Sequence, residues 1–441
     1  MKFWAILKDS LREALDTKVF YAMAGFSLLV ILLVGSVGYR PVSVEEEARN
    51  LTEQMTWIIQ RFGARHNLDS PPRWDIQDFE QTQPGARPWE TGYRFALTVT
   101  FADDQQAEQA RKVQQGTRAE IQRLLRQRLS YLKQLEVAEE KPRDPKEMRY
   151  QVSAEGGTTS RIQDWPHQVV LFFVVPIRLW SYPIVTYVHF WESTIINWLG
   201  AAVALLISTI VTAFFIPNML RKGTVDLLIV KPISRSALLF YKYVGGMTFM
   251  FLNTVVVVVG IWLVLGLRTN LWGTGFLFSI AVLTFQFAMY YAVSTLFAVL
   301  TRSSIVAILM TCLAWFLFAF VIGYGYQGVD MTRKVRDIVM DMQEEMGEDN
   351  KAVEQMPAKL LPDWVYTTAD IIHFVTPHLK DLDVLTDKWI LDDVYPPENP
   401  QRKIADKVYA NFHWTEAVAV TFLYILVLLG LSCWRFATRD Y

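Results

Sequence analysis

Six long apolar windows constrain this chain more than any other feature of its sequence. A helix needs about 20 apolar residues to cross a hydrocarbon layer about 30 Å thick, and each window supplies them almost without charge. The windows are residues 19–38, 195–216, 244–267, 276–300, 305–326 and 416–435. The sequence therefore predicts a polytopic α-helical membrane protein with six transmembrane helices.

The composition agrees with a membrane protein and argues against two other classes. Hydrophobic residues make up 52% of the 441 residues, which is too apolar for an ordinary soluble protein. The net charge of −1 offers no basic excess to neutralise phosphates, so we predict no nucleic-acid partner. Cys312 and Cys433 both lie in apolar windows, which predicts neither a disulfide framework outside the membrane nor a cysteine-based metal site.

Residues 1–18 have the pattern of an amphipathic helix ahead of the first window. Apolar residues recur at helical spacing from Phe3 to Leu15, and basic residues lie between them. A helix of this kind lies in the plane of the membrane interface rather than crossing it. We predict an elbow helix here, and the alternative is a simple membrane-entry segment.

A large polar insert, residues 39–194, separates the first two windows. Residues 94–101 alternate between apolar and polar side chains, as a half-buried strand does. Residues 148–153 and 169–175 indicate two further strands, the second of them buried, and residues 104–138 show the apolar face of a long helix. Together they predict an α+β domain outside the membrane.

The distribution of basic residues orients the six predicted spans. Six spans place both termini on the same side as the loops 217–243 and 301–304, and that side carries most of the basic residues near the membrane. The short loop on the opposite side contains only Arg268. Because cytoplasmic loops are enriched in lysine and arginine, we predict that the 217–243 loop and the tail 436–441 are cytoplasmic. The α+β insert and a second polar segment, 327–415, are then external.

No motif of the chain supplies catalytic chemistry. The sequence contains no Gly-x-x-x-x-Gly-Lys-[Ser/Thr] phosphate loop, no Gly-x-Ser-x-Gly elbow and no His-Glu-x-x-His zinc helix. We therefore predict that the chain is not an enzyme and binds no cofactor.

Two histidines near the last window could in principle hold a metal ion. Asp370 lies shortly before His373, and Asp381 and Asp383 lie shortly after His378. Their spacing fits no standard zinc-ligand pattern. We predict surface polar residues here and no metal site.

The predicted spans contain almost no ionisable residues. Ion-driven and proton-driven transporters generally need acidic residues or histidine inside the membrane. The spans offer Asn253, Thr284, Gln286 and Ser294 instead, with Glu416 at a membrane edge. We predict that Asn253 and Gln286 form hydrogen bonds between helices. A secondary transporter is therefore disfavoured, and any energy source lies outside the spans.

The loop between the second and third windows contains the sequence RKGTVDLLIVKPISR at residues 221–235. This sequence resembles the corresponding loop of ABC type-2 transporter permeases. The ending WRFATRDY at 434–441 is similar to the aromatic, basic and acidic ending of the family. The segments at 361–362 and 375–383 resemble the proline-containing segment that precedes its last span. The resemblance covers the elbow helix and all six windows but not the α+β insert.

The resemblance implies that a separate cytoplasmic ATPase drives the chain through a coupling helix in this loop. A short helix beginning near Gly223 could present an apolar face to a groove on the ATPase. Pro232 would end that helix, and Ser234 could cap the next one. The alternative is that the basic residues only orient the spans. The candidate coupling residues are Gly223, Thr224, Asp226, Leu228, Ile229, Lys231, Pro232, Ser234 and Arg235.

We therefore predict the permease subunit of an ATP-driven exporter in the inner membrane of a prokaryote. Its expected partners are a cytoplasmic ABC ATPase, a second permease chain, identical or related, and the lipid bilayer. The alternative function is a membrane-anchored scaffold or sensor, whose external domain binds a ligand or a partner protein.

Overall fold

The computed structural model describes most of the chain. The described residues are 18–63, 72–83, 86–105, 107–108, 118, 121–123, 125–126, 129, 131–156, 165–176, 182–197, 216–217, 234–334, 361–395, 397, 400–410 and 412–438. The predicted elbow helix and, apart from their ends, the second apolar window and the 217–233 part of the loop lie outside them. The chain divides into two compact units.

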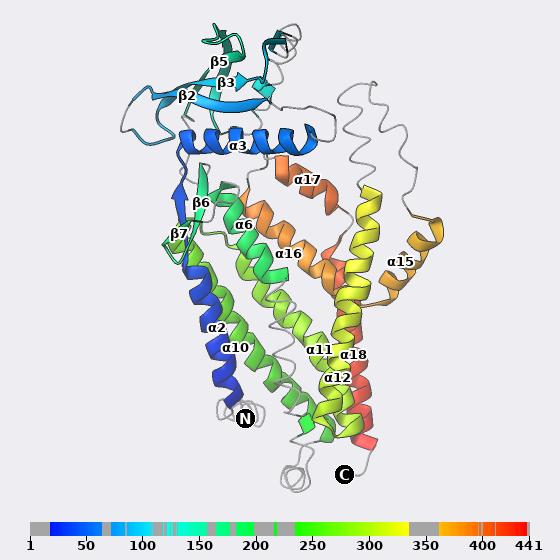
Figure 1. Cartoon of the computed structure of the whole chain (residues 1–441). Helices are drawn as coiled ribbons and strands as arrows, with labels where there is room; N and C mark the ends of the chain where they lie inside the picture. The colour runs from blue at the N-terminus through cyan, green and yellow to red at the C-terminus, as the bar shows by residue number, and fades with distance from the viewer. Residues whose placement is uncertain are drawn as a thin grey trace. The chain divides into compact units, whose positions relative to one another are not determined.

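The first unit, Met1–Gly35 with Val188–Tyr441, is helical. Figure 1 shows its long helices running side by side. The elements, including α6 which begins before Val188, are α2 (Lys18–Gly35), α6 (Ile184–Thr194), α10 (Arg235–Thr269), η3 (Gly275–Phe278), α11 (Ser279–Thr301), α12 (Ser304–Trp315), the π-helical η4 (Phe316–Tyr324), α15 (Asp363–Val375), α16 (Leu379–Val394), α17 (Pro400–Val408) and α18 (Trp414–Thr438).

Four helices within the described residues are long and apolar enough to cross a membrane. A shorter apolar helix, Tyr21–Gly35, lies within the first predicted window, 19–38, whose last residues, Val37 and Gly38, belong to strand β1 (Val37–Pro41). The four long helices are Arg235–Thr269, Gly275–Thr301, Ser304–Lys334 and Trp414–Thr438. They contain the last four predicted windows, so the structure bears out four of the six predicted spans. The second window, 195–216, lies outside the described residues apart from its ends, and the first two spans stay predictions.

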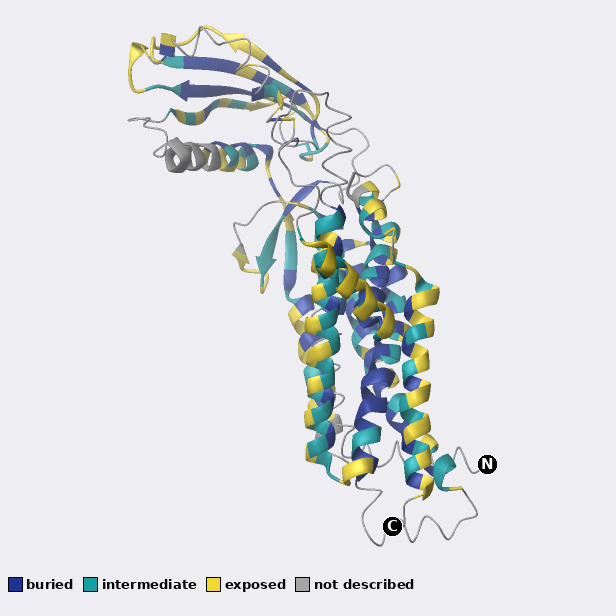
Figure 2. Cartoon of the chain, turned by 90° about the vertical axis from the view of Figure 1, so that its right-hand side faces the viewer, coloured by how far each residue is buried: buried dark blue, intermediate teal, exposed yellow. Residues whose placement is uncertain are grey.

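Helix α11 is the central helix of this unit. It packs against α10, α12 and α18, and a larger share of it is buried than of the other three spans. In Figure 2 the surrounding helices are buried where they face one another and exposed on their outward sides. The outward residues of these spans are largely apolar, as lipid-facing positions require.

Two polar contacts connect α2 to α10. The Ser27 hydroxyl donates a hydrogen bond of 3.1 Å to Asn253 Oδ1, which confirms the predicted interhelical role of Asn253. Arg268 Nη2 donates a bond of 2.6 Å to the Gly35 carbonyl at the end of α2. That carbonyl has no partner in its own helix, so the arginine completes the helix terminus.

Gly246 allows α10 and α11 to approach closely. A Cβ at this position would lie 2.6 Å from the ring of Tyr291, which stacks on Tyr243 at a centroid distance of 5.0 Å. We expect Gly246→Ala to destabilise the unit by about 1–3 kcal/mol, because an overpacked core must shift. The thermal midpoint of the purified chain in detergent measures the effect. Gly430→Ala is the control, because nothing lies within 4 Å of its Cβ, and an unchanged midpoint in Gly246→Ala would contradict the prediction.

The second unit, Ser36–Tyr187, is an α+β structure with two antiparallel sheets. One sheet has the strand order β2-β3-β5-β4, and helix α3 (Val44–Gly63) packs against β2. Its strands are β2 (Arg73–Gln81), β3 (Gly92–Thr100), β4 (Lys133–Glu140) and β5 (Glu147–Glu155). In the other, β6 pairs with β1, β7 and β8; its strands are β1 (Val37–Pro41), β6 (Pro166–Leu171), β7 (Val175–Pro176) and β8 (Tyr182–Pro183). The strands predicted at 94–101 and 148–153 are confirmed as β3 and β5.

The predicted long helix at 104–138 is wrong at its C-terminal end. Described residues between 104 and 126 are helical, but residues 133–138 belong to strand β4, in which Val137 faces Val152 of β5. Leu135 and Val137 are buried and their neighbours exposed, which is the two-residue period of a strand. The spacing of Leu132 and Leu135 fits a helix equally well, so the sequence pattern was ambiguous.

Side chains from the upstream helical segment cover the outer edge of β4. Arg118 Nε donates to the Val137 carbonyl at 3.0 Å, and Gln122 and Arg126 each donate to the Leu135 carbonyl at 3.4 Å. An uncovered edge strand would invite pairing with another chain. The arginines therefore satisfy the carbonyl groups that a further strand would use.

The strand predicted at 169–175 is confirmed only for residues 169–171, which belong to β6 and are half-buried, because the chain reverses after Leu171. The Val174 amide donates a bond of 3.1 Å to the Leu171 carbonyl. Phe172 and Phe173 have φ angles of 49° and 61°, positive as at the central residues of a type I′ turn, and the pairing of Leu171 with Val175 leaves three residues in the loop. The two phenylalanines are 61% and 58% exposed. The apolar run is therefore a hairpin tip between β6 and β7.

Candidate functional site

The described part of the predicted coupling loop is the start of α10. Ser234 is the N-cap of this helix, and its hydroxyl accepts a hydrogen bond of 3.2 Å from the Ala237 amide. The predicted capping role of Ser234 is thereby confirmed. Arg235 is the first residue of the helix. The other candidate coupling residues, from Gly223 to Pro232, lie outside the described residues.

A buried polar cluster lies where α16 packs against α11, η4 and α18. Lys380 Nζ and Asp383 Oδ2 form an ion pair of 2.7 Å, with side chains 7% and 2% exposed. Gln286 of α11 donates to Asp383 Oδ1 at 2.6 Å and to the Leu379 carbonyl at 3.0 Å. This confirms the predicted role of Gln286 in joining helices. Burial opposes the charge of Lys380, but the Asp383 carboxylate outweighs it and raises the Lys380 pKa.

The π-helical η4 makes room for the Lys380 side chain. A Cβ at Gly323 would lie 2.9 Å from the Lys380 Cβ, so only glycine fits beneath the lysine stem. The Lys380 ammonium lies 4.5 Å from the centre of the Tyr324 ring, a distance at which a cation is attracted to the ring face. π-helical turns are rare and frequently mark functional sites. Three features therefore position the Lys380 side chain: the ion pair with Asp383, the Tyr324 ring and the space left by Gly323.

The two histidines considered above lie next to this cluster. His373 Nε2 and Asp381 Oδ2 are 2.9 Å apart, and His378 Nδ1 is 3.8 Å from the same oxygen. The prediction of surface polar residues is wrong for His378, Asp381 and Asp383, which are 2%, 6% and 2% exposed. It holds for Asp370, which is exposed and pairs with Arg333 at 2.8 Å.

Ring stacking and a backbone hydrogen bond fix the two histidines. The His378 ring lies 4.1 Å from that of His373 at an interplanar angle of 7°, and Tyr326 stacks on the other face of His373 at 3.7 Å. His378 Nε2 is 2.7 Å from the His373 carbonyl oxygen, which can only accept, so Nε2 carries the proton. Burial and the neighbouring His373 lower the pKa of His378. In the neutral His378 ring, Nδ1 therefore offers a lone pair.

Comparison with known proteins decides the family. A family profile described as "ABC-2 family transporter protein" matches residues 4–441. The chain belongs to the ABC-2 transporter family. Members are non-catalytic membrane subunits of ABC transporters, so this ABC-2 chain is a transmembrane permease, and an ATP-binding partner is implied. Among curated proteins, none matches the chain significantly.

Sequence reasoning missed two features of this ABC-2 permease. It did not single out Lys380, and it treated 327–415 as an external polar segment without a buried part. The pattern Leu379, Leu382 and Leu385 repeats every three residues and could have indicated a buried helix face. All three are buried, and they carry Lys380 and Asp383 into the packed region.

A second buried acid of the ABC-2 permease lies in α6. Glu192 is 2% exposed, and burial, aided by the nearby Asp393, raises its pKa to about 8 from an ordinary value of 4.5. Asp393 in turn accepts a hydrogen bond of 2.8 Å from the Gly275 amide, at the start of η3. Glu192 is therefore protonated in the folded chain at neutral pH.

We expect Glu192→Gln to remove part of the pH dependence of stability. Between pH 4.5 and about 8 the folded chain keeps this proton and the unfolded chain releases it, so the stability of the wild type falls as pH rises. The glutamine amide does not titrate. The thermal midpoint of the variant minus that of the wild type should therefore increase as the pH is raised from 4.5 to about 8. Glu416→Gln, at an exposed position, is the control. A difference that does not change with pH would contradict the prediction.

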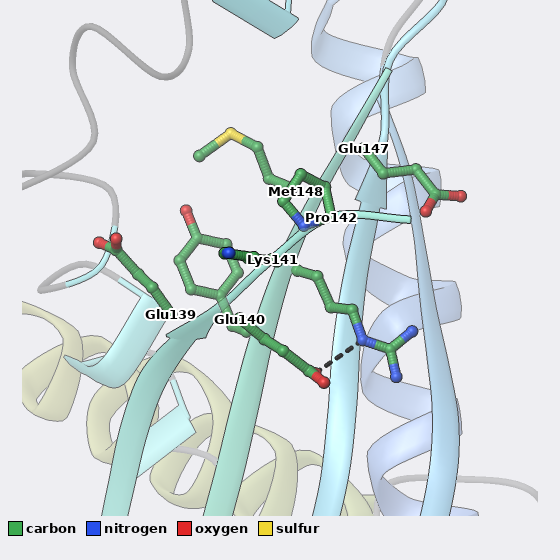
Figure 3. Close-up of a pocket in the computed structure, with 8 residues that line it drawn as sticks. Glu139, Glu140, Lys141, Pro142, Glu147 and Met148 are labelled. Carbon is green, nitrogen blue, oxygen red and sulfur yellow. Dashed lines mark hydrogen bonds and ion pairs between the residues drawn. The ribbon is translucent and has the colours of Figure 1, made fainter. Parts of the chain in front are cut away.

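The α+β unit of the permease contains an open pocket of about 300 Å³ at the ends of β4 and β5, lined by charged and apolar residues. Glu140, labelled in Figure 3, lines this pocket, and its carboxylate lies 2.7 Å from Arg149 Nε. The Arg149 guanidinium also bonds to Asp78 and holds the Asp78 pKa below its usual range. Glutamates 139 and 147 and Lys141 complete the polar lining. Because Arg149 is engaged in these bonds, it serves the fold rather than an anionic ligand.

Proposed function

We propose that this chain is the membrane-spanning permease subunit of an ATP-driven exporter, and that it does not itself hydrolyse ATP. The observation that carries the proposal is the family match over residues 4–441, which includes every apolar window. The absence of a phosphate loop from the sequence assigns hydrolysis to a partner. Two permease chains, identical or related, would pair to form the pathway.

The 217–243 loop is the proposed contact with a cytoplasmic ATPase. Its apolar residues, Leu228 and Ile229 among them, suit a groove on a partner, and its basic residues suit acidic groups of the ATPase or lipid headgroups. The loop leads directly into α10, which begins with the capped turn at Ser234. Movement of the loop would therefore act on the end of a membrane-spanning helix.

Co-purification and ATPase assays with the full complex test this proposal. Leu228→Asp should abolish co-purification or stimulated ATP hydrolysis, because a hot-spot residue contributes about 2 kcal/mol or more, about 30-fold in affinity. Leu228→Met keeps the apolar face and is the matched control. Arg235→Glu tests, by the same two assays, whether the positive charge at the start of α10 contributes to binding of the ATPase. If no ATPase stays with the chain and both variants leave transport unchanged, the proposal fails.

The proposed topology has six spans, both termini cytoplasmic, and the α+β unit outside the inner membrane of a prokaryote. The support is the concentration of basic residues at both termini and in the 217–243 loop. Cysteines introduced singly at Arg143 and Arg302, in a background without Cys312 and Cys433, test it. A membrane-impermeant thiol reagent should label only the Arg143 position in intact cells. Labelling at the Arg302 position alone would contradict the proposed topology and indicate the opposite orientation.

A second candidate function is a membrane-anchored scaffold or sensor. It is favoured by the α+β unit, which has its own buried core, including Trp165, Phe95 and Val152, and the pocket of Figure 3. Deleting residues 45–190 separates the two functions. A permease should keep its stimulated ATPase activity, whereas a sensor should lose its output.

A further inference from the structure

We propose that His373, His378 and Asp381 form a binding site for a zinc ion that joins α15 to α16. His373 lies in the last turn of α15, His378 is the N-cap of α16, and Asp381 lies in its first turn. The proposal goes beyond the permease function and does not depend on it.

The three side chains already lie at distances close to those of a metal site. One ligand atom of each residue lies within 4.8 Å of the other two. The measured separations are 2.9 Å between His373 Nε2 and Asp381 Oδ2, and 3.8 Å between His378 Nδ1 and the same oxygen. Ligands at about 2.0–2.2 Å from a tetrahedral zinc ion lie about 3.3–3.6 Å apart. These two distances would each change by well under 1 Å on binding, and the two histidine nitrogens, within 4.8 Å of each other, must reach the same spacing.

His378 supplies an observation that points to a ligand independently of this spacing. Its side chain is 1% exposed, and Nδ1 has no hydrogen-bond partner among the described residues. A buried polar atom left unpaired is costly. Its other nitrogen donates to the His373 carbonyl, and a metal-ligating histidine commonly donates its second ring N–H to such an acceptor. The proton of the neutral His378 ring therefore lies on Nε2, which leaves Nδ1 free to bind a metal ion.

Binding requires one ring to turn, because a metal ion lies in the plane of each imidazole that binds it. The two rings are now nearly parallel, so one ion cannot lie in both planes. His373 is the ring that can turn, since its side chain is 15% exposed and that of His378 only 1%. Turning the His373 ring about its Cβ–Cγ bond would also require Tyr326, which stacks on it at 3.7 Å, to move.

The donor set selects the class of metal. Two imidazole nitrogens and one carboxylate suit zinc and other late transition metals, whereas calcium and magnesium prefer oxygen ligands. Three protein ligands leave the fourth tetrahedral position for water or another ligand. Since the ligands come from two helices, the bound ion would hold the end of α15 against the start of α16.

Zinc binding by the full chain in detergent tests the proposal. The protein is stripped with a chelator, dialysed against zinc, and analysed for metal content by mass spectrometry. The wild type should retain about one more zinc ion per chain than His378→Gln or Asp381→Asn, and zinc should raise its thermal midpoint but not theirs. His413→Gln, at an exposed histidine outside the cluster, should behave as wild type.

Two measurements keep the test decisive if a variant folds poorly. The metal-free thermal midpoint of each variant shows whether it is folded, and only folded variants are compared. Cobalt added to the stripped wild type should give the visible absorption of tetrahedral Co²⁺, and zinc should abolish it. The proposal is overturned if cobalt gives no such spectrum, or if the wild type retains no more zinc than folded His378→Gln.

Discussion

Replacing Lys380 by methionine is expected to destabilise the helical unit by about 3–5 kcal/mol, because it leaves a buried carboxylate without its cation. The Asp383 side chain is 2% exposed, and the lysine ammonium 2.7 Å away is its counter-charge. The Gln286 amide remains at 2.6 Å from the other carboxylate oxygen, but a neutral donor replaces only part of the lost interaction. The thermal midpoint of the purified chain, or its resistance to denaturing detergent, measures the loss.

A variant cycle shows whether the charge pair itself causes the loss. Lys380→Met with Asp383→Leu removes both charges and should recover much of the stability, since apolar replacements of a buried ion pair are often neutral or stabilising. Lys388→Met is the control on the same helix. Its ion pairs with Asp392 and Asp406 are partly exposed, and pairs of that kind contribute about 0–1 kcal/mol. If Lys380→Met costs no more than Lys388→Met, the ion pair is not important for stability.

Replacing Trp165 by alanine is expected to destabilise the α+β unit by about 3–5 kcal/mol, the usual cost of deleting a large buried aromatic side chain. Trp165 is 1% exposed. Its ring meets that of Tyr131 edge to face at 4.8 Å, and its Nε1 donates to the Val42 carbonyl at 2.9 Å. That hydrogen bond connects the core to the segment between β1 and α3.

Trp165→Phe separates the ring from its hydrogen bond. It keeps most of the packing, so its cost should be intermediate and include about 1–3 kcal/mol for the unpaired carbonyl. Limited proteolysis of the full chain measures the effect, because cleavage between residues 36 and 187 reports opening of this unit. Trp364→Ala, at a residue that is 69% exposed, is the control. Equal protease resistance of Trp165→Ala and wild type would contradict the prediction.

The features that the sequence predicted correctly depend on local patterns. Length and hydropathy alone locate the described membrane helices, and strict alternation locates β3. Ser234 caps α10 because a serine directly before a helix can satisfy a backbone amide of its first turn. Asn253 and Gln286 form the expected interhelical bonds because a polar side chain in an apolar helix needs a partner.

The features that it missed depend on contacts between distant residues. Strand β4 is stabilised by pairing with β5 and by side chains that cover its outer edge, and neither is visible in residues 133–140 alone. The cluster around Asp383 depends on Gln286, which is 97 positions away. The hairpin at Phe172 and Phe173 breaks the usual preference for asparagine and glycine at such turns, so an apolar run there indicated a strand.

The length of α10 has a mechanical consequence. Its 35 residues correspond to about 52 Å of helix, against a hydrocarbon layer of about 30 Å. If the helix, which contains no proline, moves as one rod, it tilts as a lever. A tilt of about 10° about the end at Arg235 would move the far end by about 9 Å. Arg268, which lies there and binds the end of α2, would carry α2 with it.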